Sequence, residues 1–484
     1  KKQKPVYGGE ELAQNEDYTS NPLQEIEIKD TVSLLRQIID TLPENQREVL
    51  ILREIEELEF EETGVTRKER WKIMWASIIG YAMDGLDVLI LSFAMAAIVS
   101  EFGLTLGEGG LIATYTLIGT VLGGYLFGIF ADYFGRVHTF SLTIIIFSIF
   151  TGACAFADNV THLNILRFLA GLGLGGEYGI GMTLVSETWP AAKRARATAG
   201  VAMGWQAGAV LAAILAAVVL PDYGWRGLFL VGVVPALLAA WARHGIKEPP
   251  MWVKRKEMKK ELAARKANGE TLTAEEEEQL AEARKFPLAH LFASPSKTVT
   301  TLSLTVMTSV QNFGYYGIMV WLPMILLKEH GLTTKSMSGW MIVTVIGMIA
   351  GIYVFGYLCD RLGRKIPYLI FYICAAAMVY IYVNLGTPIA LLFGGAFLGF
   401  FCNGMMAGYG TLLSENYTTD ARSTAQNFIF NTGRAVGGFA PAIIGALAQS
   451  HGFSAAFALL SCVYVAAAVN VLLFIKDTKG TVIR

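Results

Sequence analysis

Apolar runs of about twenty residues, separated by short charged loops, recur along the chain from Trp71 almost to its end. A helix of about twenty apolar residues crosses the ~30 Å hydrocarbon core of a bilayer, and lipid offers no hydrogen-bond partners to an open backbone. The sequence is 54% hydrophobic and 16% charged, whereas a soluble domain carries about 25% charged residues. The chain is therefore predicted to be an all-α membrane protein.

The runs divide into twelve predicted transmembrane helices in two groups of six. We expect them at residues 73–97, 109–131, 138–157, 163–186, 199–220, 227–243, 299–327, 337–359, 366–384, 388–413, 426–448 and 454–475. The predicted domains are a soluble helical extension (1–66), a six-helix bundle (67–243), cytoplasmic linker helices (244–297) and a second six-helix bundle (298–484).

Positive charge in the short loops predicts the orientation in the membrane. One set of loops holds eight Lys and Arg residues and the opposite set holds three. Cytoplasmic loops are enriched in these residues, so we expect both termini and the linker in the cytoplasm. The net charge of −1 and five cysteines without metal-ligand spacing lead us to expect no nucleic-acid partner, no metal and no cofactor.

An internal repeat is the strongest signal in the sequence. Two motifs of the first half recur in the second half at the same displacement of 228 residues. The recurring residues are Gly128, Asp132, Gly135 and Arg136 against Gly356, Asp360, Gly363 and Arg364, and Glu187 and Arg194 against Glu415 and Arg422. Two unrelated motifs with one displacement indicate parallel repeats about an axis along the membrane normal.

The first motif resembles the signature loop of the major facilitator superfamily, and the resemblance covers about residues 70–484. Arg167-x-x-x-Gly171-x-Gly173 is similar to a second motif associated with proton-coupled members. The resemblance implies a monomeric secondary transporter, not an enzyme, that moves a solute by alternating access between two halves. Its expected partners are a small-molecule substrate, a proton and the lipid bilayer.

Short segments within the helices resemble particular branches of that family. Asp84-Gly-Leu-Asp87 and Gly176-Glu177-Tyr178 are similar to sialate and aromatic-acid proton symporters, whereas Thr432-Gly-Arg434 resembles niacin-type carriers, as does the segment from Asn312 to Tyr316. We therefore expect proton-coupled symport of a small organic anion, a carboxylate metabolite. A facilitator or proton antiporter for a neutral or cationic solute remains the alternative, because three membrane acids would suit a cation.

The extension at 1–66 resembles part of region 4 of bacterial sigma factors, beginning at Leu42-Pro43-Glu44. The resemblance stops where the turn and recognition helix that enter a major groove should begin. The segment is also acidic, without a stripe of phosphate-binding side chains. We therefore expect an appended segment without a DNA-binding role, rather than a membrane-tethered regulator.

Ionisable side chains inside a bilayer are costly and indicate functional sites. The predicted proton-coupling residues are Asp84, Asp87, Glu177 and Arg167. Burial and a second carboxylate nearby favour the protonated form of a carboxyl group, so such acids can bind a proton on one side and release it on the other. The alternative is that the two aspartates only satisfy helix packing or pair with Arg167.

Arg434 is the predicted anion contact, because its planar fork can hold a carboxylate through two parallel hydrogen bonds. The residues expected to complete the substrate site are Gln206, Gln311, Asn312, Tyr315 and Tyr316. The alternative is a structural role for Arg434, tying its helix to the cytoplasmic loops.

The repeated motifs lie at helix ends, too far from the midplane to bind substrate. We expect them to form charge networks that hold the outward-facing state closed on the cytoplasmic side. The predicted gating residues are Asp132, Arg136, Asp360, Arg364, Glu187, Arg194, Glu415 and Arg422. Glu187 with Arg194, and Glu415 with Arg422, are expected to belong to the same networks.

Overall fold

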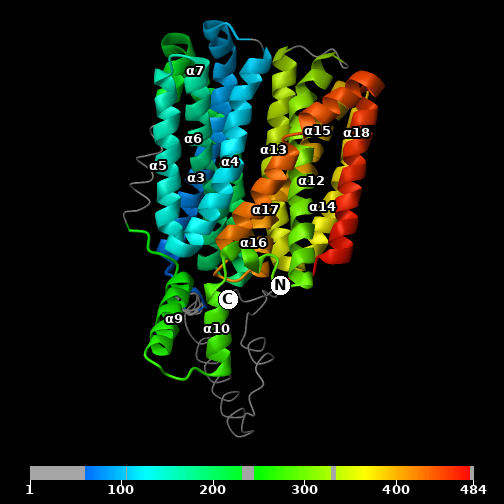
Figure 1. Ribbon diagram of the computed structural model, residues 1–484. Helices are drawn as coiled ribbons and strands as arrows, with labels where there is room; N and C mark the ends of the chain where they lie inside the picture. Colours follow the sequence, from blue (N-terminus) through cyan, green and yellow to red (C-terminus); the bar gives the residue numbers. More distant parts are fainter. Residues whose placement is uncertain (1–59, 61, 105, 232–244, 329–333, 480–484) are drawn as a thin grey trace, which may run out of the picture. The chain divides into compact units, whose positions relative to one another are not determined.

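The computed structural model describes residues 60, 62–104, 106–231, 245–328 and 334–479. Within these ranges every regular element is a helix (Figure 1), which confirms the predicted all-α membrane fold. Nearly all of the sigma-like extension at 1–66 lies outside the described residues, as does most of the predicted span at 227–243.

The first half packs as two pairs of long helices, α3 against α7 and α4 against α6. Its elements are α3 (Arg67–Phe102), α4 (Leu106–Phe134), α5 (Arg136–Ala153), η2 (Cys154–Phe156), α6 (Val160–Thr188), η3 (Ala191–Lys193) and α7 (Arg194–Leu230). The contact between α4 and α6 is backbone to backbone: a Cβ atom at Gly175 would lie 2.0 Å from the Thr120 carbonyl oxygen. Small residues allow such close approach of membrane helices.

The second half repeats this pairing, with α13 against α15 and α12 against α17, and α14 packs against α18. Its elements are α12 (Pro295–Lys328), α13 (Thr334–Leu362), α14 (Lys365–Val383), α15 (Pro388–Gly404), α16 (Met406–Asn416), α17 (Arg422–Gly437) and α18 (Ala440–Phe474). Between the halves are the linker helices α9 (Pro250–Ala267), α10 (Ala274–Arg284) and α11 (Pro287–His290). We call the end of the bundle at α9 and α10 the linker side (Figure 1).

The backbone follows the repeat of the sequence. Gly224 interrupts α7 with φ 63° and Gly452 interrupts α18 with φ 82°, again 228 residues apart. Gly135 and Gly363, which precede α5 and α14, also have positive φ, at 113° and 86°. Because side chains disfavour this left-handed region, both halves use glycine for the same two changes of direction.

Nine stretches of the described residues are long and apolar enough to cross a membrane, fewer than the twelve predicted. One of them, Arg422–Phe474, has 53 residues, which at ~1.5 Å per residue is far longer than one crossing. Gly452 divides it, so it contains two predicted spans. α12 carries hydroxyl, amide and lysine side chains and is not among the nine.

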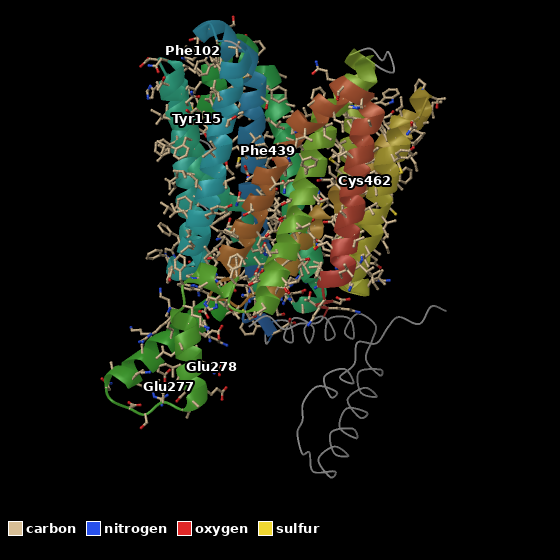
Figure 2. All side chains as sticks on the ribbon, turned by 45° about the vertical axis from the view of Figure 1, so that its right-hand side comes forward. Phe102, Tyr115, Glu277, Glu278, Phe439 and Cys462 are labelled. Atoms are coloured by element: carbon tan, nitrogen blue, oxygen red, sulfur yellow. The ribbon has the colours of Figure 1, made fainter. Side chains whose placement is uncertain are left out.

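The surface of the bundle differs from that of the linker. Figure 2 shows Tyr115 and Phe439 on the outside of the bundle, where they are exposed, and Glu277 and Glu278 on α10. Large apolar patches on a protein surface indicate contact with a non-aqueous partner. The exposed apolar bundle and the charged linker therefore suit lipid and water respectively.

Candidate functional site

A small cavity lies between the two halves, with a volume of about 30 Å³, enough for water but not for a metabolite. All six predicted substrate residues line it. The full lining is Tyr81, Ala202, Trp205, Gln206, Gln311, Asn312, Tyr315, Tyr316, Asn403, Met406, Phe430 and Arg434. The structure thus brings together polar side chains from α3, α7, α12, α15 and α17.

The prediction missed three aromatic walls of this cavity, Tyr81, Trp205 and Phe430. Aromatic residues in apolar helices are common, so composition alone does not single them out. Helical spacing offers a signal, because Phe430 lies one turn before Arg434 and thus on the same face of α17.

A buried ion pair joins the halves at this cavity. Arg434 Nη2 donates a hydrogen bond to Asp84 Oδ2 at 3.1 Å, so α17 contacts α3. The guanidinium carbon lies 5.6 Å from the Trp205 ring centroid and 5.5 Å from that of Phe430, within the range of cation–π attraction. Aromatic faces therefore stabilise Arg434 on two sides while one edge contacts Asp84.

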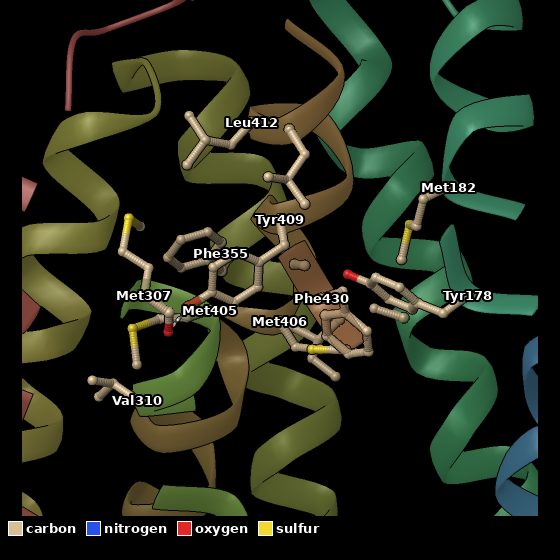
Figure 3. Packing of buried hydrophobic residues seen from close by; sticks show 14 of the residues in the cluster. Tyr178, Met182, Met307, Val310, Phe355, Met405, Met406, Tyr409, Leu412 and Phe430 are labelled. Carbon is tan, nitrogen blue, oxygen red and sulfur yellow. Dashed lines mark hydrogen bonds between the residues drawn. The ribbon is translucent and has the colours of Figure 1, made fainter. Parts of the chain in front are cut away.

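Phe430 is held in place by the first half of the chain. The ring of Tyr178, on α6, stacks on Phe430 with centroids 3.7 Å apart (Figure 3). Tyr178 in turn packs against Tyr81. Tyr178 therefore contacts two rings that line the cavity, Tyr81 and Phe430. Because Phe430 belongs to the second half and both tyrosines to the first, this wall of the cavity depends on the relative position of the halves.

Asp87 and Arg167 form a second buried pair that lies wholly in the first half. Arg167 donates from Nη2 and Nη1 to the two Asp87 oxygens at 2.7 and 3.1 Å, and Thr151 donates to Asp87 at 2.6 Å. Arg167 Nε also donates to Thr116 at 3.2 Å. Neither charged residue lines the cavity. The pair therefore connects α3, α4, α5 and α6.

Glu177 is buried without a cation in contact among the described residues. Its Oε1 accepts a hydrogen bond from the Thr143 hydroxyl at 2.5 Å, and its Oε2 has no partner in the described part of the chain. A Cβ atom at Gly80 would lie 3.1 Å from Oε2, so Glu177 faces α3 one turn before Asp84. It does not line the cavity.

On the linker side, two aspartates each cap a helix of the opposite half. Asp132 accepts hydrogen bonds from the amides of Ser423 (3.1 Å) and Thr424 (2.8 Å) and from the Thr424 hydroxyl (2.6 Å) at the start of α17. Asp360 accepts from the amide and Nε of Arg196 at 3.3 and 2.7 Å, at the start of α7. Carboxylates stabilise helix N-termini by binding their unpaired amides.

The two arginines of the repeated motif each bind the glutamate of their own half. Arg136 donates to both oxygens of Glu187 at 3.1 Å. Arg364 donates to both oxygens of Glu415 at 3.0 and 2.7 Å. Such bidentate pairs are the strong form of the charge-assisted hydrogen bond.

The remaining two arginines, Arg194 and Arg422, each bind the glutamate of the other half. Arg422 donates to Glu187 at 2.6 Å, and Arg194 donates to Glu415 at 3.1 Å. We expected Glu187 to group with Arg194 and Glu415 with Arg422, and these contacts join the two groups, because each glutamate contacts an arginine of the other half. Sequence proximity did not indicate this exchange, which follows from the two-fold arrangement of the repeats. All eight predicted gating residues therefore lie in contacts on the linker side.

Known proteins resemble nearly the whole bundle. The sequence profile of the Major Facilitator Superfamily matches residues 77–379 and 304–482. A putative metabolite transport protein of Haemophilus influenzae is 44% identical over 85% of this chain and 97% of its own. The cis,cis-muconate transport protein of Acinetobacter baylyi is 30% identical over 84% and 95%.

The niacin transporter NiaP of Acinetobacter baylyi is 29% identical over 85% of this chain and 95% of its own. This agrees with the niacin-type segments noted above. Among solved structures, the proton:xylose symporter XylE bound to 6-bromo-6-deoxy-D-glucose matches with a TM-score of 0.72 and 19% identity. That match covers 86% of this chain and 97% of XylE, and it shows a shared fold.

Proposed function

The chain belongs to the Major Facilitator Superfamily, and we propose that it is a proton-coupled symporter of a small organic anion, a carboxylate metabolite. We place it in a bacterial inner membrane with both termini and the linker helices in the cytoplasm. One observation carries the proposal: the buried pair of Arg434 and Asp84, which joins the two halves at the cavity.

Arg434 has unused capacity to bind an anion. A guanidinium group carries five N–H donors, and its hydrogen bond to Asp84 uses one of them. Its Nη2 contacts a single oxygen of Asp84, whose other oxygen has no partner among the described residues. A substrate carboxylate that reaches the cavity can therefore compete with Asp84 for the same fork.

The need for charge balance couples the competition between substrate and Asp84 for Arg434 to the binding of a proton. Two carboxylates facing one arginine would leave an uncompensated negative charge in a buried site, at a cost of several kcal/mol. If Asp84 takes up a proton as the substrate binds, the site again holds one positive and one negative charge. Proton and anion are then bound together and released together, which is symport.

The other acids of the first half have different proposed roles. Asp87 is already neutralised by two hydrogen bonds from Arg167 and a third from Thr151, so this pair holds α3 in place rather than exchanging protons. Glu177 has no such cation among the described residues, and its Oε2 faces Gly80, which lies one turn before Asp84 on α3. It is the second carboxyl group able to carry a proton along α3.

The relatives support the anionic substrate class. The proteins named for muconate and niacin transport carry compounds that are carboxylates. In this chain the cavity provides one arginine for such a group and five aromatic side chains for its body.

The contacts on the linker side would close the cytoplasmic end of the pathway. The Asp132, Asp360, Arg422 and Arg194 interactions all cross between the halves. Rocking the halves apart on this side must break them, so they set the free energy of the outward-facing state.

Uptake into proteoliposomes tests the proposal. A panel of radiolabelled carboxylates is offered with an acidic exterior and, in parallel, with equal pH on both sides and with an acidic interior. A symporter accumulates its substrate only with the acidic exterior. A facilitator reaches the same final level in all three conditions, and an antiporter accumulates against the opposite gradient, so either result rejects proton symport.

A further inference from the structure

We propose that His290 senses the pH of the cytoplasm and that its protonation weakens a strap across the two halves on the linker side. The strap is the segment at residues 248–255, which includes the start of α9. Protonation of His290 then favours the state that is open to the linker side. That this side faces the cytoplasm rests on the proposed function.

The strap contacts both halves of the bundle. In the first half, Glu248 accepts hydrogen bonds from the first three amides of α5, the shortest at 2.7 Å, and Trp252 Nε1 donates to the Asp132 carbonyl oxygen at 3.0 Å. In the second half, Arg255 donates to Asp420, in the loop before α17, at 2.7 Å. Separation of the halves on the linker side must therefore break one of these contacts or move α9.

His290 is a buried titratable residue beside the strap, and the proposed transport cycle does not use it. Its Nδ1 lies 3.5 Å from Glu282 Oε1 on α10, and its side chain is 5% exposed. Its Nε2 is buried without a partner in the described part of the chain. Both ring nitrogens of an imidazolium donate, so protonation in this position would leave a buried N–H without an acceptor, which is unfavourable.

Burial keeps His290 neutral while the linker side is closed. It lowers the pKa of the imidazole below its ordinary value; the carboxylates of Asp420 and Glu282 oppose this effect, and the cations Lys285 and Arg255 add to it. A protonated His290 would also compete with Arg255 for Asp420 and so weaken the ion pair of the strap. Because the closed state binds this proton less readily, acid favours a state in which water reaches the imidazole.

The short helix α11, which carries His290, lies against both halves. It packs against α4 in the first half and α17 in the second. Directly after it, the ring of Phe292 lies 6.2 Å from that of Phe428 on α17, which in turn lies 4.9 Å from Tyr125 on α4. Rocking α4 and α17 apart must therefore disturb the surroundings of His290 and admit water.

This arrangement gives import a negative feedback. A symporter that imports protons acidifies the side to which it delivers them. Protonation of His290 favours opening to that side, so fewer carriers return to the opposite side to load. Import therefore slows as the cytoplasm becomes acidic.

The distance between two spin labels measures this opening without substrate and without a pH gradient. The labels are attached at Leu142→Cys on α5 and Ile370→Cys on α14, exposed positions 228 residues apart. The full-length protein, with its five native cysteines replaced by Ser, is studied in nanodiscs by double electron–electron resonance. We expect the ratio of open to closed molecules to rise about threefold from about pH 7.5 to 5.5, within the limit of about tenfold per pH unit for one proton.

The variant His290→Gln keeps a polar side chain that takes up no proton. It should match the wild type at the higher pH and lose the threefold response. His162→Gln, at an exposed histidine near the start of α6, is the matched control and should keep the response. Asp420→Asn leaves His290 in place but weakens the ion pair with Arg255, so it should be more open at the higher pH and respond less to acid.

A His290→Gln variant that responds to acid as the wild type does overturns the inference, as does a wild type whose distances ignore pH. His138 is an exposed histidine that contacts Glu248 at 2.7 Å. Loss of the response in His138→Gln with retention in His290→Gln would assign the sensing to the other end of the strap and also overturn it.

An unchanged response in Asp420→Asn overturns the role of the strap, and this test holds even where His290→Gln fails to fold. The proposed function fails separately, when uptake ignores a pH gradient, since the label distances are measured without substrate.

Discussion

The contacts on the linker side differ from the cavity between the halves, because the sequence repeat is preserved in the contacts and lost in the cavity. On the linker side, each of Asp132, Arg136, Glu187 and Arg194 has an identical residue 228 positions later, and both copies make equivalent hydrogen bonds. Among the cavity residues, Gln206 corresponds to Arg434, and Asn312 corresponds to Asp84, the residue that contacts Arg434.

This difference separates two tasks. A contact that opens and closes as two similar halves rock against each other serves equally well from either half, so both copies are kept. The proposed competition for Arg434 instead needs opposite charges from opposite halves. The first half supplies the acid and the second half supplies the arginine, and their pair exists only across the interface.

The largest effect should come from removing the acid that contacts Arg434. Asp84→Asn resembles the permanently protonated state, so it should abolish substrate accumulation driven by a pH gradient while preserving exchange of substrate between the two sides. Both are measured in proteoliposomes, with wild type for comparison. We expect Glu177→Gln to reduce accumulation less, because Asp84 contacts Arg434 whereas Glu177 accepts its hydrogen bond from Thr143.

Loss of exchange together with accumulation in Asp84→Asn would contradict this role and leave Asp84 as a packing residue. The repeat provides a control at Asn312, the neutral counterpart of Asp84. Asn312→Ala should preserve the dependence of uptake on the pH gradient even where it lowers affinity.

Arg434 should show the next largest effect, on affinity. Arg434→Ala removes both the charge and the fork, and we expect substrate binding to weaken by about 3 kcal/mol, roughly 100-fold. Arg434→Lys keeps the charge without the planar fork and should weaken binding by roughly tenfold. Calorimetry measures both, and a variant that binds normally but cannot exchange substrate would instead indicate a structural role.

The two copies on the linker side should differ modestly, despite their symmetry. Both aspartates accept from two backbone amides, but the side chain that also donates to Asp132, Thr424, is buried, whereas the Arg196 side chain that donates to Asp360 is 44% exposed. Water can replace part of an exposed contact. We therefore expect Asp132→Asn to slow exchange by roughly tenfold and Asp360→Asn by about threefold.

Substrate affinity should stay near that of the wild type in both gate variants, because neither residue lines the cavity. Initial rates of exchange and calorimetry on the same preparations separate the two quantities. Equal slowing by both variants would show that exposure does not decide the strength of these contacts, and lost binding in a folded variant would place Asp132 in the substrate site.

The parts of the site that could be predicted from the sequence are those marked by polar or charged residues within apolar helices and by the internal repeat. Polar side chains within apolar helices stand out, so all six predicted substrate residues could be chosen from the sequence, and they line one cavity. The aromatic walls Tyr81, Trp205 and Phe430 could not, because an aromatic ring suits lipid, core and ligand equally. The exchange of arginines between Glu187 and Glu415 depends on how two repeats face each other, which local pattern does not encode.

The smallest effect is expected outside the repeat. Removing residues 1–58, which lie outside the described residues, should leave membrane insertion and uptake unchanged, because the repeated motifs and the cavity lie entirely within Glu59–Arg484. A deletion that extends through Thr66 should differ, since the Thr66 hydroxyl caps α3 by accepting from the Glu69 amide and Glu69 binds the Thr66 amide in return. Loss of such a cap costs about 1 kcal/mol, so the longer deletion and Thr66→Ala should lower thermal stability slightly and to a similar extent. Thermal unfolding and uptake of the two deletions measure this, and loss of insertion or transport in the shorter one would show that the extension is required by the bundle.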